Sequence, residues 1–164
     1  KLRDITPMEL KQAFDDMSFA LDCYAHAGFT AREGANRNTD AFMRNTRIMR
    51  VLGYHADTLR REGIRFDEMD VMEDFHVALS LLERGHENVV LNDFAHNQAG
   101  GSGAQGGCSH FRTPELQAAN ARRLAELHPD FVKVTQKTTK GAWGGGTRTD
   151  VTVQWKKAYE SSRR

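Results

Sequence analysis

The most regular pattern of apolar positions lies in residues 71–85, which read Val-Met-Glu-Asp-Phe-His-Val-Ala-Leu-Ser-Leu-Leu-Glu-Arg-Gly. The pattern predicts an apolar helix over Glu73–Glu83, with Gly85 in the position of a left-handed cap. Two adjacent acids, Glu73 and Asp74, stand at the beginning of this helix. A carboxylate at that point would be held by a rigid element.

Two further helices are predicted from their start signals. The hydroxyl of Thr6 can cap a helix, Pro7 suits the first helical position, and Glu9 can close a capping box. Apolar residues then follow roughly helical spacing as far as Leu21. The second helix starts at a Thr-Pro-Glu sequence and covers residues 113–127, where a His-Pro pair stops it.

The rest of the chain predicts short strands joined by polar turns. We expect strands at 23–29, near 50–54 and at 89–91, a loop at 32–38, and a helix or turn at 40–49. Apolar and polar residues alternate over 132–137 and 151–155 around a glycine-rich turn, which predicts a β-hairpin with one face in water. The glycine-rich stretch 100–107 predicts a flexible loop that can close over a ligand. This order of elements indicates an α/β or α+β fold.

Composition narrows the class of protein. The chain has 164 residues, enough for one domain or for half of a larger one, and 39% hydrophobic with 27% charged residues is typical of a globular protein. The net charge of +1 does not by itself indicate nucleic acid, so such a partner would need a local patch. Two cysteines without a CxxC argue against a disulfide framework and a zinc knuckle. No apolar run suits a membrane span and no signal peptide is recognisable, so we expect a cytoplasmic protein without a membrane partner.

The Glu73–Asp74 pair has two interpretations. Acids at a helix N-terminus satisfy free N–H groups and complement the helix dipole, which is a purely structural role. Alternatively, one of them is a general base that takes a proton from an acceptor hydroxyl. Neighbours on a helix point about 100° apart, so one acid would be catalytic and the other structural.

Two histidines, His96 and His110, flank the glycine-rich loop. A loop histidine is commonly an ordinary surface residue. A histidine that follows a buried strand is also well placed to bind a metal or a phosphate. A metal site would need a carboxylate partner, which the spacing does not identify.

Two sets of mainly basic residues stand out. Guanidinium groups suit bidentate phosphate contacts, and the first set is Arg32, Asn36, Arg37, Arg44 and Arg47. The second set lies on the predicted hairpin, beside Trp143 and Trp155, and consists of Lys133, Lys137, Lys140, Arg148, Lys156 and Lys157. It could follow a nucleic-acid backbone, although edge strands also use lysine to avoid aggregation. Neither glycine-rich stretch matches a P-loop or a dinucleotide fingerprint.

Several segments, in this order, resemble the phage glycosyltransferases associated with ten-eleven-translocation dioxygenases, which have the GT-A fold. The matching segments are residues 25–28, 32–37, 72–85, 88–91, 106–113, 128–133 and 153–157. The resemblance covers nearly the whole chain and is moderately specific, because the motifs keep the family's order. It implies an α/β, GT-A-like fold with a Rossmann-like sheet flanked by helices, followed by the C-terminal β-hairpin.

The same resemblance implies a function. A sugar would be moved from a nucleotide-sugar donor, a UDP-sugar, to a hydroxymethylated pyrimidine in phage DNA in the host cytoplasm. Asp74 would be the catalytic base, with Glu73 supporting it. His96, or else His110, would lie near a divalent metal (Mn or Mg) and the diphosphate. Donor or acceptor contacts would come from Arg32, Asn36, Arg37 and Lys133.

One departure from the family is the lack of a D-x-D motif, which in GT-A enzymes holds the metal and the nucleotide diphosphate. In the family this motif lies upstream of the matched region. We therefore expect residues 1–164 to be a glycosyltransferase domain without its N-terminal nucleotide-binding half, which a missing segment or a partner chain would supply. The alternative function is a non-catalytic nucleic-acid-binding or assembly module that uses the basic hairpin.

Overall fold

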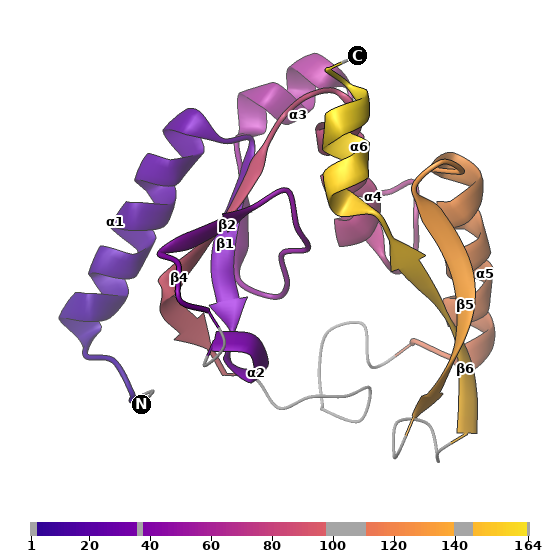
Figure 1. The fold of residues 1–164 in the computed structure, drawn as a ribbon, viewed down its shortest axis with the longest axis horizontal. Helices are drawn as coiled ribbons and strands as arrows, with labels where there is room; N and C mark the ends of the chain where they lie inside the picture. Colours follow the sequence, from indigo (N-terminus) through magenta and orange to yellow (C-terminus); the bar gives the residue numbers. More distant parts are fainter. Residues whose placement is uncertain (1–2, 36–37, 98–110, 140–145, 164) are drawn as a thin grey trace.

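A mixed four-stranded sheet forms one half of the molecule (Figure 1). The computed structural model describes residues 3–35, 38–97, 111–139 and 146–163. Strands β1 (His26–Ala31) and β4 (Asn88–His96) run parallel in the middle of the sheet. Strands β2 (Phe42–Arg44) and β3 (Leu52–Tyr54) pair antiparallel with β4 and β1 and form its edges. The fold is therefore α/β, as the sequence predicts.

Helix α1 (Pro7–Cys23) packs against this sheet. It begins as predicted, with the Thr6 side chain accepting a hydrogen bond from the N–H of Glu9 and the Glu9 side chain accepting one from the N–H of Thr6. Its buried residues, spaced three or four apart, are Ala13, Met17 and Ala20. They meet the sheet residues Ala27, Phe29 and Val89 in one core cluster.

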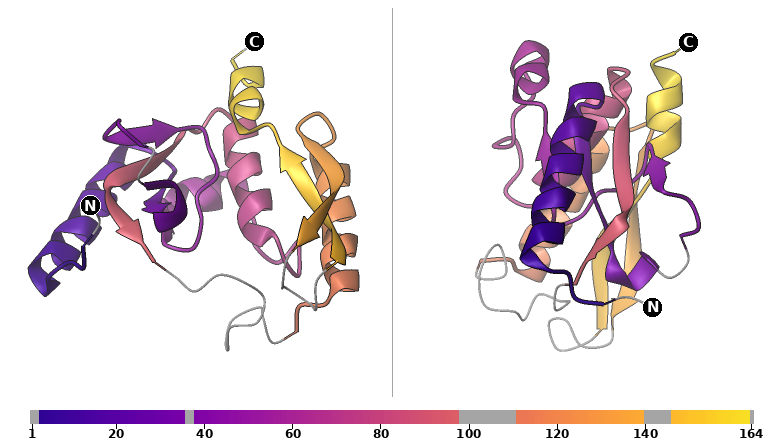
Figure 2. Two further views of the ribbon diagram at one scale, coloured as in Figure 1. Left: turned by 60° about the horizontal axis from the view of Figure 1, so that its bottom comes forward. Right: turned by 90° about the vertical axis from the view of Figure 1, so that its left-hand side faces the viewer.

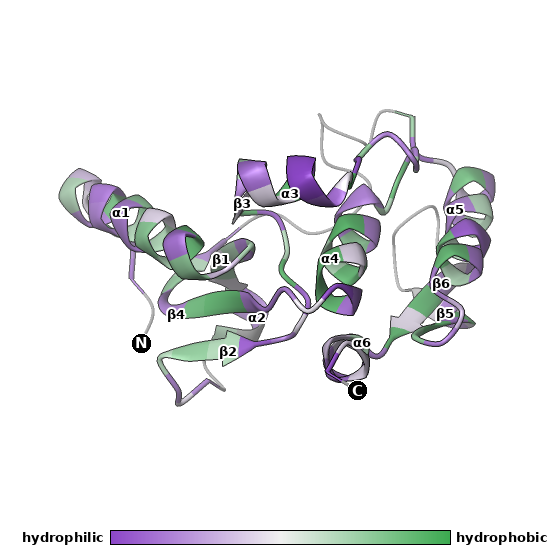
Figure 3. Ribbon diagram, turned by 90° about the horizontal axis from the view of Figure 1, so that it is seen from above, coloured by the Kyte–Doolittle hydropathy of each residue, from purple (hydrophilic) through white to green (hydrophobic). Residues whose placement is uncertain are grey.

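Helix α4 (Glu73–Glu83) lies between the sheet and the C-terminal part of the chain (Figure 2). All of its residues from 76 to 82 are buried. Val77 and Leu81 pack with Ala25 of the sheet side. Leu79 and Leu82 belong to a second cluster with residues of the C-terminal part. A helix that is apolar on several faces has to be buried on several sides, and the hydropathy colouring in Figure 3 shows this central position.

The C-terminal part contains a two-stranded antiparallel sheet and two helices. Strand β5 (Val132–Thr139) pairs with β6 (Gly146–Val153), which confirms the predicted hairpin strands. Helix α5 (Pro114–Leu127) starts after Thr113, whose side chain accepts from the N–H of Leu116. The prediction of a strand as far as residue 155 was wrong, because α6 (Trp155–Ser161) begins there and buries Ala158.

A buried chain of polar side chains joins α4 to the end of α5. His76 Nδ1 lies 3.0 Å from His128 Nε2, and His128 Nδ1 lies 2.6 Å from Glu83 Oε1. His76 is 6% and His128 is 4% exposed. Burying these polar rings is tolerated because each finds a partner.

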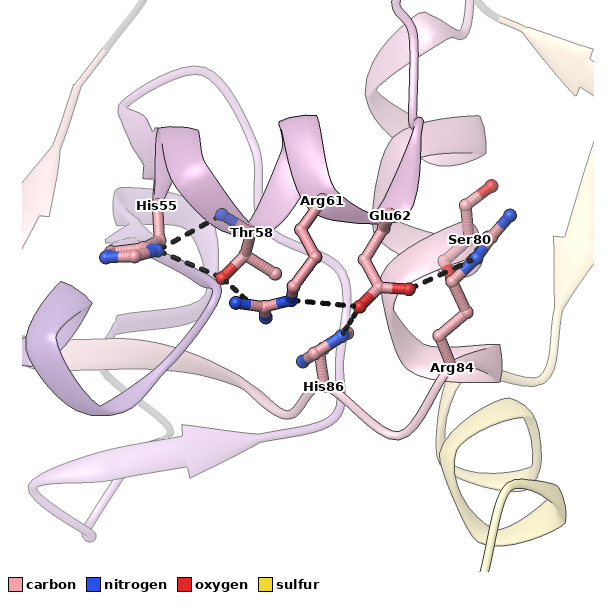
Figure 4. A network of polar contacts seen from close by, with 7 residues as sticks. All are labelled: His55, Thr58, Arg61, Glu62, Ser80, Arg84 and His86. Carbon is pink, nitrogen blue, oxygen red and sulfur yellow. Dashed lines mark hydrogen bonds and ion pairs between the residues drawn. The ribbon is translucent and has the colours of Figure 1, made fainter.

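Helix α3 (Ala56–Glu62) is tied to the loop after α4 by the network in Figure 4. Glu62 Oε1 lies 2.9 Å from His86 Nε2, and Glu62 Oε2 lies 3.7 Å from Arg84 Nε. The α4 C-terminus ends as predicted, with Gly85 at φ 84°. These contacts hold the C-terminal end of α4, and they therefore help to fix the direction of its N-terminal end.

Three other predictions need correction. The helix or turn expected at 40–49 contains β2, because Phe42 pairs with Leu91 at the edge of the sheet. The strand expected at 23–29 begins later, since α1 continues to Cys23, and the predicted loop at 32–38 starts with the helical turn α2 (Arg32–Ala35). The loop predicted at 100–107 lies outside the described residues. None of the helices described here is long and apolar enough to cross a bilayer.

Candidate active site

A cleft of about 570 Å³ lies at the N-terminal end of α4, and we call it the α4 cleft. One wall comes from residues 47–54, the other from residues 71–75, and Phe66 and Arg112 complete it. The volume is in the range of small-molecule sites. The cleft contains both acids that the sequence singled out.

The wall at residues 47–54 can approach the sheet because of a glycine in β1. A Cβ on Gly28 would lie 2.3 Å from Ile48 Cγ2 and 2.6 Å from the Val51 carbonyl oxygen. Since such distances are impossible, only glycine allows this segment to pack where it does. Gly28 thus positions Arg47, which is next to Ile48, and Arg50, which is next to Val51.

The turn before α4 has an unusual backbone. Met72, the N-cap residue, has φ 65° and provides no side-chain cap. A non-glycine residue in this region is uncommon, and such residues concentrate at functional sites. The turn places both Glu73 and Asp74 on the wall of the cleft.

Asp74 differs from a surface carboxylate. Burial raises its pKa, the charge of Arg47 opposes that shift, and Glu73 adds to it. A desolvated carboxylate with a raised pKa binds a proton more tightly than an exposed one, which suits a general base. Backbone N–H groups of Asp74 and Phe75 favour its charged form, so a partial capping role coexists with this environment.

Three arginines line the same cleft. The guanidinium of Arg47 lies 4.2 Å from the centre of the Phe75 ring. Arg112 donates to the side-chain oxygen of Gln117, from Nε at 2.9 Å and also from Nη2. Arg50 pairs with Glu33 at 3.3 Å. Arg47 belongs to the set of residues predicted to bind phosphate. Arg50 and Arg112 were not among the predicted residues.

Sequence reasoning missed a stacked aromatic pair, one ring of which lines the cleft. Tyr54 lines the cleft and stacks on His26, with ring centres 4.3 Å apart and planes 17° from parallel. His26 is 1% exposed, and burial lowers its pKa to about 3. The Tyr54 hydroxyl is buried and has no hydrogen-bond partner within the described residues. Burial and the charges of Asp74 and Glu73 raise its pKa, so Tyr54 stays a protonated donor.

His96 lies away from the acids of the cleft. Burial lowers its pKa, the neighbouring Arg50 lowers it further, and Glu33 opposes both. A guanidinium nearby disfavours a bound cation. Over the residues with described structure, no three His, Cys, Asp or Glu side chains come together as a metal site. The described residues around His96 do not form a metal-binding group. A metal site formed by His96 and His110 stays a prediction, because His110 lies outside the described residues.

The other predicted contacts are scattered. Arg32 lines a different hollow of about 540 Å³, which we call the N-terminal hollow, together with Arg3, Glu9 and Asp93. Lys133 is exposed on β5 and does not line the α4 cleft. Asn36 and Arg37 lie outside the described residues. Of the candidate side chains that the structure describes, only the two acids and Arg47 line the α4 cleft.

No family model, curated protein or solved structure significantly matches this chain. The α4 cleft is therefore the feature of the described structure that bears most directly on function.

Proposed function

We propose that this chain is a glycosyltransferase domain in which Asp74 is the general base. The observation that carries the proposal is the desolvated Asp74 carboxyl, with its raised pKa, in a cleft that also contains Arg47. A base of this kind activates an acceptor hydroxyl, and guanidinium groups across the cleft suit a phosphorylated donor. The matching segments of the sequence occur in the same order as in the phage enzymes. This resemblance supports transfer of a sugar to hydroxymethylated DNA as the particular reaction.

In the proposed reaction each residue has a distinct role. Asp74 accepts the proton of the acceptor hydroxyl while the hydroxyl oxygen attacks the anomeric carbon of the sugar. Glu73 supports the site by adding negative charge, which keeps Asp74 more basic. Tyr54 lines the cleft beside the two acids and contributes ring surface to the wall against which the ligand would lie.

The direct test incubates the protein with a panel of nucleotide sugars and with DNA that contains hydroxymethylated pyrimidines. The expected result is a mass gain of one sugar on the modified base, measured by mass spectrometry of the digested DNA. Unmodified DNA is the matched control, because it lacks the acceptor hydroxyl. No mass gain with any donor, for a protein shown to be folded, would contradict the proposed function.

The alternative of a nucleic-acid-binding module receives less support from the basic hairpin. Asp150 takes up two of its cations, lying 3.3 Å from Lys137 Nζ and 2.8 Å from Arg148 Nη2. Exposed Lys133 remains available on β5. The alternative predicts steeply salt-dependent DNA binding that Lys133→Glu weakens and Asp74→Asn does not, measured by fluorescence anisotropy.

A further inference from the structure

The guanidinium of Arg47 feels the charges of Asp74 and Asp150 but forms no ion pair with either of them. Within the described part of the chain it makes neither a hydrogen bond nor an ion pair, and it lies over the face of the Phe75 ring. The Arg47 side chain lines the cleft and remains accessible to water. A guanidinium has five N–H donors, and those of Arg47 are free for a ligand.

Arg112 is held in place by a buried amide. Gln117 of α5 is only 2% exposed and accepts hydrogen bonds from Nε and Nη2 of Arg112. Burying a polar side chain is costly unless it is bonded, so the pair fixes the orientation of the guanidinium. The Nη1 group has no partner among the residues that the structure describes, and Arg112 lines the cleft.

Arg50 completes the cluster from a strained position. Its φ is 67°, an uncommon value for a residue with a Cβ. It pairs with Glu33 at 3.3 Å, but the Glu33 side chain is 62% exposed, so this pair is open to water. A loose pair at the rim leaves Arg50 able to share its donors with an anion.

The charges of Arg50 and Arg112 both act on Arg47. Burial lowers the pKa of Arg47, Asp74 and Asp150 oppose this effect, and Arg112 and Arg50 add to it. Asp150 is already paired with Lys137 and Arg148, so little of its charge remains for Arg47. Bringing like charges together costs free energy, and an anion bound between them would reverse that cost.

We propose that Arg47, Arg50 and Arg112 hold the diphosphate of the donor, and that guanidinium groups rather than a metal ion bound by the described residues stabilise the leaving group. A diphosphate has two adjacent phosphate groups, and their oxygens can accept hydrogen bonds from several guanidinium groups at once. The assignment of that diphosphate to a sugar donor rests on the proposed function. The anion site itself rests on the three arginines.

In the transfer step one bond forms and one bond breaks at the anomeric carbon of the sugar. A bond forms between the acceptor oxygen and the anomeric carbon, and the bond from that carbon to the phosphate oxygen breaks. The electron pair of the broken bond stays on the diphosphate, where the arginines meet the developing charge. The acceptor proton passes to Asp74, and the products are the glycosylated acceptor and a nucleoside diphosphate.

The test measures binding of inorganic pyrophosphate by isothermal titration calorimetry in buffer with EDTA. We expect the parent protein to bind without added metal, and Arg47→Gln to weaken binding about 10- to 100-fold, because it removes a charged hydrogen-bonding partner. Arg112→Gln should weaken it similarly. The matched control is Arg123→Gln on α5, whose side chain is 52% exposed and lies away from the cleft lining; it should bind as the parent does. Circular dichroism melting of each variant shows that it is folded.

Three results would overturn the anion site. One is pyrophosphate binding that EDTA abolishes, a second is equal affinity of the parent protein and Arg47→Gln, and a third is no binding at all. A 5′-hydroxyl single-stranded oligonucleotide serves as competitor. If it binds the arginines more tightly than pyrophosphate does, these residues contact a nucleic-acid backbone and the proposal falls.

The two proposals can fail separately. If pyrophosphate binds through the arginines but no sugar is transferred from any donor, the anion site stands and the assignment to a sugar donor falls. If sugar is transferred but Arg47→Gln leaves pyrophosphate affinity and the donor KM unchanged, the glycosyltransferase stands and the arginine site falls.

Discussion

The N-terminal hollow and the α4 cleft have similar volumes, about 540 and 570 Å³, and both contain arginines and acids. In the N-terminal hollow Arg3 bonds to Glu9, which also caps α1, and these contacts lower the pKa of Glu9 to about 2. In the α4 cleft Asp74 is desolvated and its pKa is raised, while Arg47 acts on it by charge and forms no ion pair within the described residues. Charges that satisfy one another in water stabilise a local structure, whereas charges held apart and desolvated are available to a ligand.

The largest expected difference between the two sites is in the chemical step. Asp74→Asn removes the base but keeps the shape of the side chain, so the rate of sugar transfer should fall about 10²- to 10⁴-fold. The matched change Asp93→Asn in the N-terminal hollow should leave the rate unchanged. Rates are measured by incorporation of labelled sugar into hydroxymethylated DNA. Transfer by Asp74→Asn at the parent rate would show that Asp74 is not the base.

The wall of the α4 cleft can be disturbed without touching a charge. Gly28→Ala forces a Cβ against Ile48 and the Val51 carbonyl, and overpacking of this kind costs about 1–3 kcal/mol of unfolding free energy. It should also weaken pyrophosphate binding, because the segment that carries Arg47 and Arg50 has to move. Urea unfolding and titration calorimetry measure the two effects.

The matched control is Gly53→Ala in β3. A Cβ there would lie 2.9 Å from Leu21 Cδ1, the end of a flexible side chain that can turn away. Its destabilisation should be smaller than that of Gly28→Ala. An equal or larger loss for Gly53→Ala would contradict the role assigned to Gly28.

The electrostatic coupling in the cleft predicts a shift in pH dependence. Asp74 acts as a base only when it is deprotonated, so kcat/KM falls as the pH drops below its raised pKa. The positive charge of Arg47 favours the charged form of Asp74, whereas the negative charge of Glu73 disfavours it. The charges of both acids also raise the pKa of Tyr54. Removing the positive charge in Arg47→Gln raises the pKa of Asp74 further, and the acid limb of the profile should move to higher pH. With Arg123→Gln the limb should stay in place; a limb that moves to lower pH in Arg47→Gln would refute the coupling.

The smallest effect is expected from the arginine of the N-terminal hollow. Arg3 and Glu9 form an ion pair in which the Arg3 side chain is 67% exposed, and exposed pairs contribute little to stability. Arg3→Gln should therefore leave sugar transfer, pyrophosphate affinity and the melting temperature within experimental error of the parent. A clear loss of pyrophosphate affinity would mean that the two sites are not as different as their charge pairing indicates.

Elements with local signals were predictable from the sequence. The capping box at Thr6, the Thr113 cap of α5 and the helix from Glu73 to the left-handed Gly85 are each specified by residues within a few positions of one another. Other elements depend on distant partners. Strand β2 exists because it pairs with β4, and Trp155 joins a helix where the alternating pattern predicted a strand.

The candidate site shows the same division. The sequence by itself determined that Glu73 and Asp74 stand at the start of an apolar helix, because helical periodicity and a glycine stop are local properties. Only the tertiary structure decided that this helix start faces Arg47, Arg50 and Arg112, and that Arg32 lies in another hollow. That outcome depends on Gly28 admitting the 47–54 segment, on the left-handed Met72 and on the buried Gln117. Packing between residues that are far apart in the sequence sets the distances between these charges. Those distances decide whether an acid at a helix start is only a cap or also a candidate base.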